Sequence, residues 1–121
     1  MTLGEHQELF TQHLVQLVQQ AWDTGFNVRI GEVQRPIEMQ RLYMTAGRSK
    51  TLNSEHINKC AADLVLLLEG KVCSRDQIKP LGLWWEQLDP RNRWGGSWRG
   101  LVDQGKSSFV DAPHFERRTS A

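Results

Sequence analysis

Apolar residues recur every three or four positions in the first part of the chain, which is the spacing of one helix face. This stripe consists of Phe10, Leu14, Leu17, Val18 and Ala21. We therefore predict an amphipathic helix over residues 3 to 24, with Gly25 just past its end. From Phe26 to Val33, apolar and polar residues alternate. A period of two predicts a half-buried strand.

The middle of the chain carries the signals of a second helix and a loop. Pro36 suits the first turn of a helix that Gly47 ends. The apolar residues of this helix are Met39, Leu42, Tyr43 and Ala46. Residues 47 to 58 are polar and irregular, which predicts a surface loop.

The apolar run from Ala61 to Leu68 predicts the strongest strand of the chain. Glu69-Gly70-Lys71 forms a turn into a short partner strand at Val72-Cys73. Residues 76 to 88 predict a third helix, and a short final strand is expected near Pro113 to Arg117. About three helices beside a mainly antiparallel sheet make a small α+β domain.

Length and composition favour an ordinary globular domain. The 121 residues fit a single domain spanning 1–121. The formal net charge of +1 gives no reason to expect a nucleic-acid partner. No apolar run approaches the roughly 18 residues of a membrane span, so we expect no membrane insertion. The N-terminus has neither the basic start nor the apolar stretch of a secretion signal, which predicts synthesis in the cytoplasm.

The two cysteines and the first two histidines are interpreted as structural. Cys60 and Cys73 make no disulfide framework, and their spacing matches no zinc-binding pair. We expect two reduced, partly buried thiols, the alternative being one disulfide across a strand and its following turn. His6 and His13 flank the apolar stripe of the first helix and are expected to be exposed or half-buried.

The other two histidines and one aspartate suggest a metal site. His56 ends the polar loop, and Asp63 enters an otherwise apolar strand. A carboxylate is costly to bury there unless it is paired or bound to a metal. His114 lies in the third candidate segment. Two imidazoles and one carboxylate are a common ligand set for catalytic zinc, which keeps a fourth position for water. Spacing alone is a weak signal, because the interval before His114 is long.

Two acidic residues next to His114 extend this hypothesis. Asp111 precedes His114 by three residues, close enough to serve a hydrolytic site as the base that takes a proton from water. The alternative for Asp111 is an Asx turn beside Pro113. On a strand, Glu116 would share a face with His114, where it holds a ligand or substrate or is simply exposed.

Here a family resemblance becomes specific. The segment from Ser54 to Asp63, SEHINKCAAD, resembles the Ser-x-His-x(4)-Ala-x-Asp zinc motif of the D-Ala-D-Ala metallopeptidase family, whose fold is shared with the hedgehog signalling domain. The segments WGGSW (94–98) and DAPHFE (111–116) are similar to the phage endolysin branch, the L-alanyl-D-glutamate endopeptidases. GEVQRP (31–36), followed by residues 40 to 47, resembles the same branch. The likeness covers residues 26 to 117.

The resemblance implies a role for each matching residue. His56, Asp63 and His114 would bind one zinc ion, and Asp111 would be the general base. Arg35 would steady the carbonyl oxygen as it becomes an oxyanion, the alternative being a surface arginine beside a helix start. The remaining residues would contact substrate or line the cleft, namely Ser54, Trp94, Trp98 and Glu116. The two tryptophans are otherwise core residues. One departure is Lys59, where many members of the family have glycine.

The resemblance also implies the reaction. We expect a zinc-dependent peptidoglycan endopeptidase, endolysin-like and bacteriolytic, that hydrolyses the L-Ala–D-Glu bond of murein stem peptides. The alternatives are a D-Ala-D-Ala carboxypeptidase or dipeptidase and a non-catalytic, zinc-stabilised binding module. No separate wall-binding domain is recognised. Because the substrate lies outside the inner membrane, we expect a phage, prophage or secretion-linked protein. It would reach the periplasm and cell wall through a holin-like pore.

Overall fold

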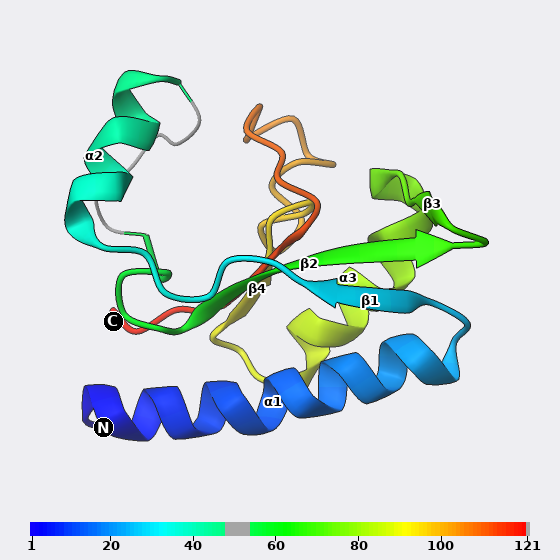
Figure 1. Cartoon of the computed structure of the whole chain (residues 1–121), viewed down its shortest axis with the longest axis horizontal. Helices are drawn as coiled ribbons and strands as arrows, with labels where there is room; N and C mark the ends of the chain where they lie inside the picture. Colours follow the sequence, from blue (N-terminus) through cyan, green and yellow to red (C-terminus); the bar gives the residue numbers. More distant parts are fainter. Residues whose placement is uncertain (48–53, 121) are drawn as a thin grey trace.

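The computed structural model describes residues 1–47 and 54–120. The chain forms helices and strands in an α+β order, with most strands in the second half (Figure 1). The elements are α1 (Leu3–Asp23), β1 (Asn27–Ile30), α2 (Ile37–Thr45), β2 (Ala61–Leu68), β3 (Lys71–Val72), α3 (Arg75–Leu88), β4 (Asn92–Trp94) and β5 (His114–Arg117). In the described part of the chain, no helix is long and apolar enough to cross a membrane.

The sheet is antiparallel, with strand order β1-β2-β5-β4 and β3 paired to the far end of β2. The long strand β2 lies in the middle of the sheet, and its side chains alternate between the two faces of the sheet. Its residues Ala62, Leu64 and Leu66 belong to the hydrophobic core, whereas Asp63 and Val65 alternate with them and point to the opposite face. The fold therefore supplies one apolar face and one face that is free for chemistry.

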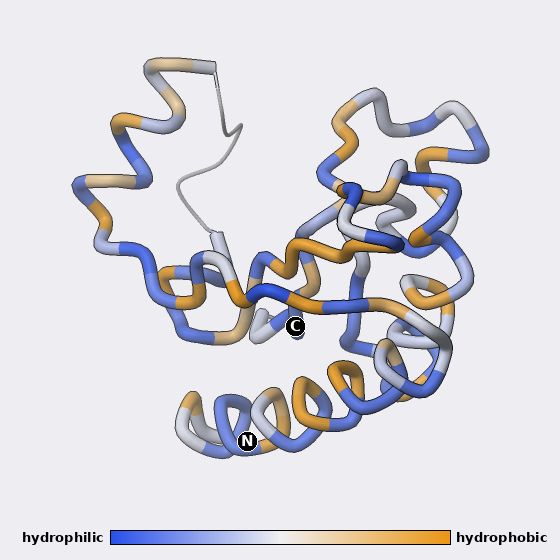
Figure 2. The backbone as a smooth tube through the Cα atoms, turned by 45° about the vertical axis from the view of Figure 1, so that its right-hand side comes forward, coloured by the Kyte–Doolittle hydropathy of each residue, from blue (hydrophilic) through white to orange (hydrophobic). Residues whose placement is uncertain are grey.

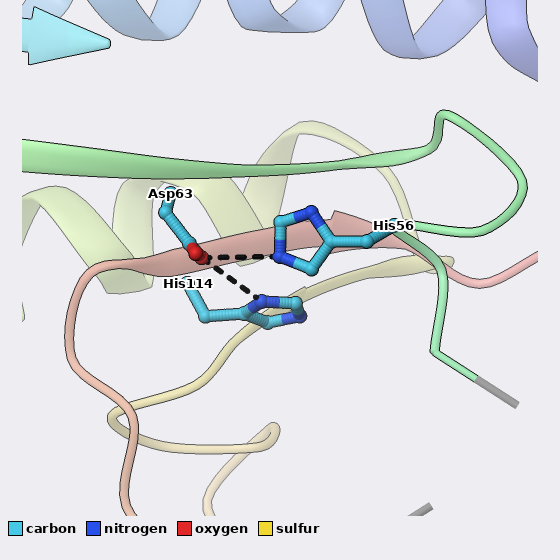
Figure 3. A group of neighbouring side chains, drawn as sticks. All are labelled: His56, Asp63 and His114. Carbon is cyan, nitrogen blue, oxygen red and sulfur yellow. Dashed lines mark hydrogen bonds and ion pairs between the residues drawn. The ribbon is translucent and has the colours of Figure 1, made fainter. Parts of the chain in front are cut away.

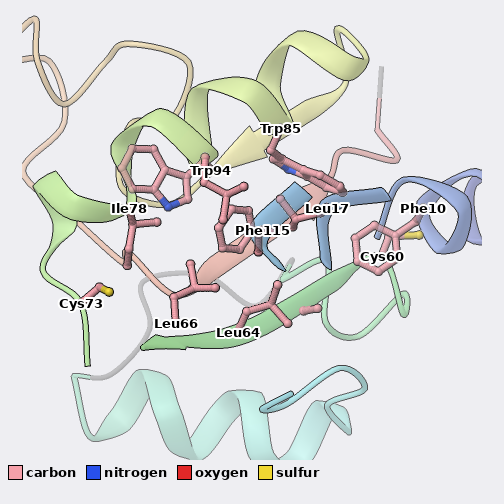
Figure 4. Packing of buried hydrophobic residues seen from close by; sticks show 13 residues of the cluster. Phe10, Leu17, Cys60, Leu64, Leu66, Cys73, Ile78, Trp85, Trp94 and Phe115 are labelled. Atoms are coloured by element: carbon pink, nitrogen blue, oxygen red, sulfur yellow. The ribbon is translucent and has the colours of Figure 1, made fainter. Parts of the chain in front are cut away.

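Helices α1 and α3 cover the apolar face. The core joins side chains of both helices to the sheet, including Phe10, Leu17, Ile78, Trp85 and Phe115 (Figure 4). Along α1, hydrophobic stretches alternate with hydrophilic ones (Figure 2). Both helices begin with a capping box, Thr2 with Glu5 in α1 and Ser74 with Gln77 in α3. Helix α2 lies apart from them, beyond the end of β1 (Figure 1).

The predicted α+β domain with its mainly antiparallel sheet is confirmed, and so are the three helices to within two residues. The strand predicted over Phe26 to Val33 is shorter, because only Asn27–Ile30 pairs with β2 as a regular strand. Ile30 is 68% exposed, since β1 is an edge strand. Pro36 is the N-cap of α2 and not a residue of its first turn. Strand β4 was not predicted. Residues 48–53, half of the surface loop predicted over 47–58, lie outside the described residues, whereas Ser54, Glu55 and His56 near its end are buried in the turn before β2.

The expectations for the cysteines and the N-terminal histidines are only partly met. Cys60 and Cys73 are free and buried, so the disulfide alternative is wrong. His13 is half-buried, as expected. His6 is instead buried and accepts a hydrogen bond of 3.1 Å from the guanidinium of Arg117. Arg117 lies 111 residues away in sequence, so the pattern around His6 carries no sign of this contact.

The close approach of α3 to Trp94 generates a stability prediction. A Cβ atom at Gly82 would lie 2.1 Å from the Trp94 ring, which is fully buried. We expect Gly82→Ala to destabilise the protein by about 2–3 kcal/mol, although alanine is the better helix former by about 1 kcal/mol. Gly4→Ala in α1 is the matched control, because its Cβ would have no neighbour closer than 3.9 Å. Urea unfolding of both variants checks this, and equal stabilities would contradict it.

Candidate metal centre

Three side chains from separate segments converge on the free face of the sheet. His56 comes from the turn before β2, Asp63 from the third position of β2 and His114 from the first position of β5 (Figure 3). Asp63 and His114 are register partners, so they share a face. His56 Nε2 lies 3.1 Å from Asp63 Oδ1, and His114 Nδ1 lies 3.4 Å from the same oxygen. One ligand atom from each residue lies within 4.8 Å of the other two, so the cluster could hold a metal ion.

A tight turn brings His56 back toward β2. The amide of Cys60 donates to the Glu55 carbonyl at 2.9 Å, and the amide of His56 donates to the hydroxyl oxygen of Ser54 at 3.2 Å. Lys59 has a φ of 57°, a left-handed conformation that costs a non-glycine residue about 1–2 kcal/mol. The turn is therefore compatible with lysine at this position, but glycine would adopt it without that cost.

A β-bulge positions Asp63. The amide of Gly31 donates to the Asp63 carbonyl at 2.7 Å, and the amide of Asp63 donates to the Glu32 carbonyl at 2.8 Å. Two residues of one segment thus oppose a single residue of β2, which bends the first segment locally. A Cβ atom at Gly31 would lie only 2.9 Å from the Asp63 carbonyl oxygen. Glycine is required here by the close approach of the two backbones.

Hydrogen bonds direct one nitrogen of each imidazole toward the cluster. His56 Nδ1 lies 2.9 Å from the Val33 carbonyl, which can only accept, so this nitrogen carries the proton and Nε2 is left for a ligand role. His114 Nε2 lies 2.7 Å from Glu116 Oε1, and Nδ1 faces Asp63. Metal-binding histidines usually have such a partner on the second nitrogen. The arrangement therefore fits that of a metal site.

The charges of the cluster are strongly coupled. Burial alone would raise the pKa of Asp63, but hydrogen bonds from His114 and His56 hold it well below its usual value. Burial would lower the pKa of His114, yet its hydrogen bonds to Asp63 and Glu116 raise it to about 9. Without a bound cation, His114 therefore keeps a proton between two carboxylates at neutral pH.

One side of the cluster opens on a cleft. The residues that line it are Arg35, Tyr43, Asp63, Phe109, Val110 and Asp111. The cleft thus brings together one residue of the cluster and both residues assigned by resemblance to catalysis. Burial raises the pKa of the Asp111 carboxyl, and the nearby charges of His114 and Asp63 act on it in opposite directions. The Asp111 carbonyl accepts from the His114 amide at 3.1 Å, which joins the two residues in a turn.

Arg35 is buried at the edge of this cleft, and its guanidinium contacts three neighbouring side chains. Its Nε donates to Glu32, and one terminal nitrogen donates to Gln40 Oε1 at 2.5 Å. The guanidinium lies 4.5 Å from the centre of the Tyr43 ring. Sequence reasoning missed these three neighbours. Gln40 is the buried residue of α2, but a buried glutamine in a polar helix leaves no periodic signal.

The four predicted substrate-binding residues lie in different places. Ser54 lines a separate hollow beside Ile37 and Thr119. Trp94 is in the core with no exposed surface, so the structure places it where the sequence alternative had it. The half-buried Trp98 ring lies 5.5 Å from the His114 ring and stacks on Phe109. Glu116 is buried and contacts His114, which agrees with the interpretation that it holds a ligand residue and rules out the alternative of a simply exposed side chain.

Comparison with known proteins shows a likeness to a solved peptidase structure. No family model and no curated protein matches the chain. The crystal structure of the Serratia marcescens L-Ala D-Glu endopeptidase ChiX is similar, with a TM-score of 0.62 and 26% identity, over 87% of this chain and 77% of that one. The chain therefore has the fold of a peptidase. Membership of the D-Ala-D-Ala metallopeptidase family stays a prediction.

The raised pKa of His114 predicts how metal affinity depends on pH. Below about 9, a cation must displace the proton that His114 holds in the metal-free protein. We expect the apparent affinity for a divalent transition metal to rise about tenfold per pH unit between roughly pH 6 and 8. Chelator competition across this range measures it. In Glu116→Gln, which lacks one of the two carboxylates, the rise should level off at lower pH. A pH-independent affinity would contradict the expectation.

Proposed function

We propose that the chain is a zinc-dependent peptidoglycan endopeptidase that hydrolyses the L-Ala–D-Glu bond of murein stem peptides. The observation that carries this proposal is the cluster of His56, Asp63 and His114 at a cleft that also contains Asp111 and Arg35. The likeness to an L-Ala D-Glu endopeptidase supports the choice of bond.

The cluster fits one zinc ion. Zinc prefers nitrogen and oxygen ligands of this kind at distances of about 2.1 Å, which places the ligand atoms of a tetrahedral site about 3.4 Å apart. The separations from Asp63 Oδ1 to the two imidazole nitrogens are 3.1 and 3.4 Å. Three protein ligands leave one position for water or substrate, as in catalytic zinc sites. When bound, zinc would polarise the scissile carbonyl and make water acidic near neutral pH.

Asp111 would move the proton. It lies in the cleft beside Asp63, and burial raises the pKa of its carboxyl above the ordinary value. A carboxylate with a raised pKa is a better base, and its acid form is ready to return the proton to the leaving amine. The turn that joins Asp111 to His114 keeps this carboxylate next to the cluster during both transfers.

Arg35 would stabilise the developing oxyanion. Its guanidinium has five N–H groups, and the contacts with Glu32 and Gln40 leave others for the cleft. A cation fixed in advance stabilises charge as it develops without reorganising, which is the largest contribution in many hydrolases. The apolar side chains of Phe109 and Val110 form part of the cleft wall.

The proposed location follows from the substrate. The chain would act in the periplasm or cell wall, as a phage, prophage or secretion-linked protein released through a holin-like pore. A D-Ala-D-Ala carboxypeptidase or dipeptidase would use the same groups. The bond cleaved therefore has to be measured directly.

Digestion of purified murein tests the reaction and its base together. We expect the zinc-loaded protein to expose a new amino terminus on D-Glu. Asp111→Asn should lower kcat about a hundred- to ten-thousand-fold and keep its zinc, because Asp111 is not a ligand. Release of D-Ala would identify the carboxypeptidase reaction. Full turnover by Asp111→Asn would show that another group is the base.

Zinc content tests the ligands separately from activity. We expect His56→Ala to lose stoichiometric zinc and all measurable hydrolysis, since two ligands do not hold the ion in this geometry. His13→Ala is the matched control, because His13 is half-buried in α1 beside Trp85 and belongs to no such cluster. Undiminished zinc in His56→Ala, measured by elemental analysis of the folded protein, would refute the ligand assignment.

A further inference from the structure

Arg93 extends the line of contacting polar side chains that starts at the cluster of His56, Asp63 and His114. It is the central residue of β4, and its register partner is Glu116 of β5. The guanidinium donates two hydrogen bonds to Glu116 Oε2, one from Nε at 2.8 Å and one from a terminal nitrogen at 2.5 Å. The Arg93 side chain is 33% exposed, whereas that of Glu116 is 6% exposed. A partly exposed arginine thus reaches a carboxylate that is buried beside a predicted ligand.

The two carboxylate oxygens of Glu116 have different hydrogen-bond partners. Oε1 lies 2.7 Å from His114 Nε2, and Oε2 receives both hydrogen bonds from Arg93. A carboxylate held at both oxygens cannot rotate without breaking a contact, so it fixes the plane of the imidazole. Without Arg93, one oxygen of this buried carboxylate would lose both hydrogen bonds that Arg93 donates, and the side chain could turn away from His114.

Trp98 holds Arg93 in place. The guanidinium carbon lies 5.6 Å from the centre of the Trp98 ring, within the range of a cation–π contact. Trp98 is itself anchored, because its indole nitrogen donates to the Phe109 carbonyl at 3.0 Å. The guanidinium therefore has an aromatic ring as a cation–π partner and a carboxylate as a hydrogen-bond partner. Lysine could reproduce the charge but neither the fork nor the stacking.

We propose that Arg93 is a positioning residue for His114, acting through Glu116 to set the strength of zinc binding. Arg93 is not among the residues that line the cleft described above, and the inference assigns it a positioning role only. The inference rests on the proposed function in one respect, namely that the cluster binds zinc. It goes beyond that function by placing a determinant of metal affinity on β4, two contacts away from the proposed ligand His114.

Zinc affinity of the folded protein, measured by chelator competition, tests the inference without any activity assay. We expect Arg93→Lys to weaken binding on the order of tenfold, as for other residues behind a ligand. The matched control is Arg75→Lys. Arg75 also pairs with carboxylates, and it lies 5.5 Å from the Trp94 ring with a side chain that is 23% exposed, but it has no contact with the cluster. Its affinity should equal that of the wild type.

A double-mutant cycle shows whether the effect passes through Glu116. At a pH where His114 is deprotonated in every variant, so that no proton competes with the metal, Glu116→Gln should weaken zinc binding by itself, and adding Arg93→Lys to it should cost little more. An equal cost in both backgrounds would overturn the proposal, and so would wild-type affinity in Arg93→Lys. A wild-type protein that binds no zinc would overturn the proposed function as well, which distinguishes the two failures. Thermal unfolding of the metal-free variants confirms that affinities are compared between folded proteins.

Discussion

The structure depends on keeping a half-buried carboxylate, Asp63, and its buried imidazole partners on the face of β2 that is turned away from the core. Antiparallel pairing with β5 achieves this, because register partners point to the same side of a sheet. Asp63 therefore meets His114, while Ala62 and Leu64 on either side pack beneath α1 and α3. A single strand supplies both the middle of the core and the centre of the polar site.

The polar groups on this face form a sequence of alternating charge across three strands. Asp63 contacts His114, His114 contacts Glu116, and Glu116 contacts Arg93. Burial of each group is tolerated because a partner of opposite sign or a hydrogen bond compensates for the lost hydration. The site is thus satisfied electrostatically within the protein itself. A cation would enter a framework that is already organised, which favours tight and specific binding.

Much of this could be predicted from local pattern. Asp63 stood out because a carboxylate interrupts an apolar strand, and period two placed Glu116 with His114. The sequence left open whether Trp94 lies in the core or in the cleft wall, because its burial follows from the pairing of β4, a strand too short to show a period. The position of Trp98 depends on rings distant in sequence, those of Phe109 and His114. The same limit applies to His6, whose burial depends on an arginine near the opposite end of the chain. Periodicity reports which face a residue takes, but partners distant in sequence appear only in the folded chain.

The alternation along β2 has a consequence for folding fidelity. If β2 slipped by one residue against its neighbours, every side chain would change faces. Asp63 would then lie among the rings that surround Trp85, and Leu64 would take its place between the imidazoles. Such a misfolded state would carry an unpaired charge in an apolar interior and a hydrocarbon where ligands are needed. Asp63 thus has two effects: it contributes to the polar site, and it destabilises an incorrect alignment of β2 with its neighbours.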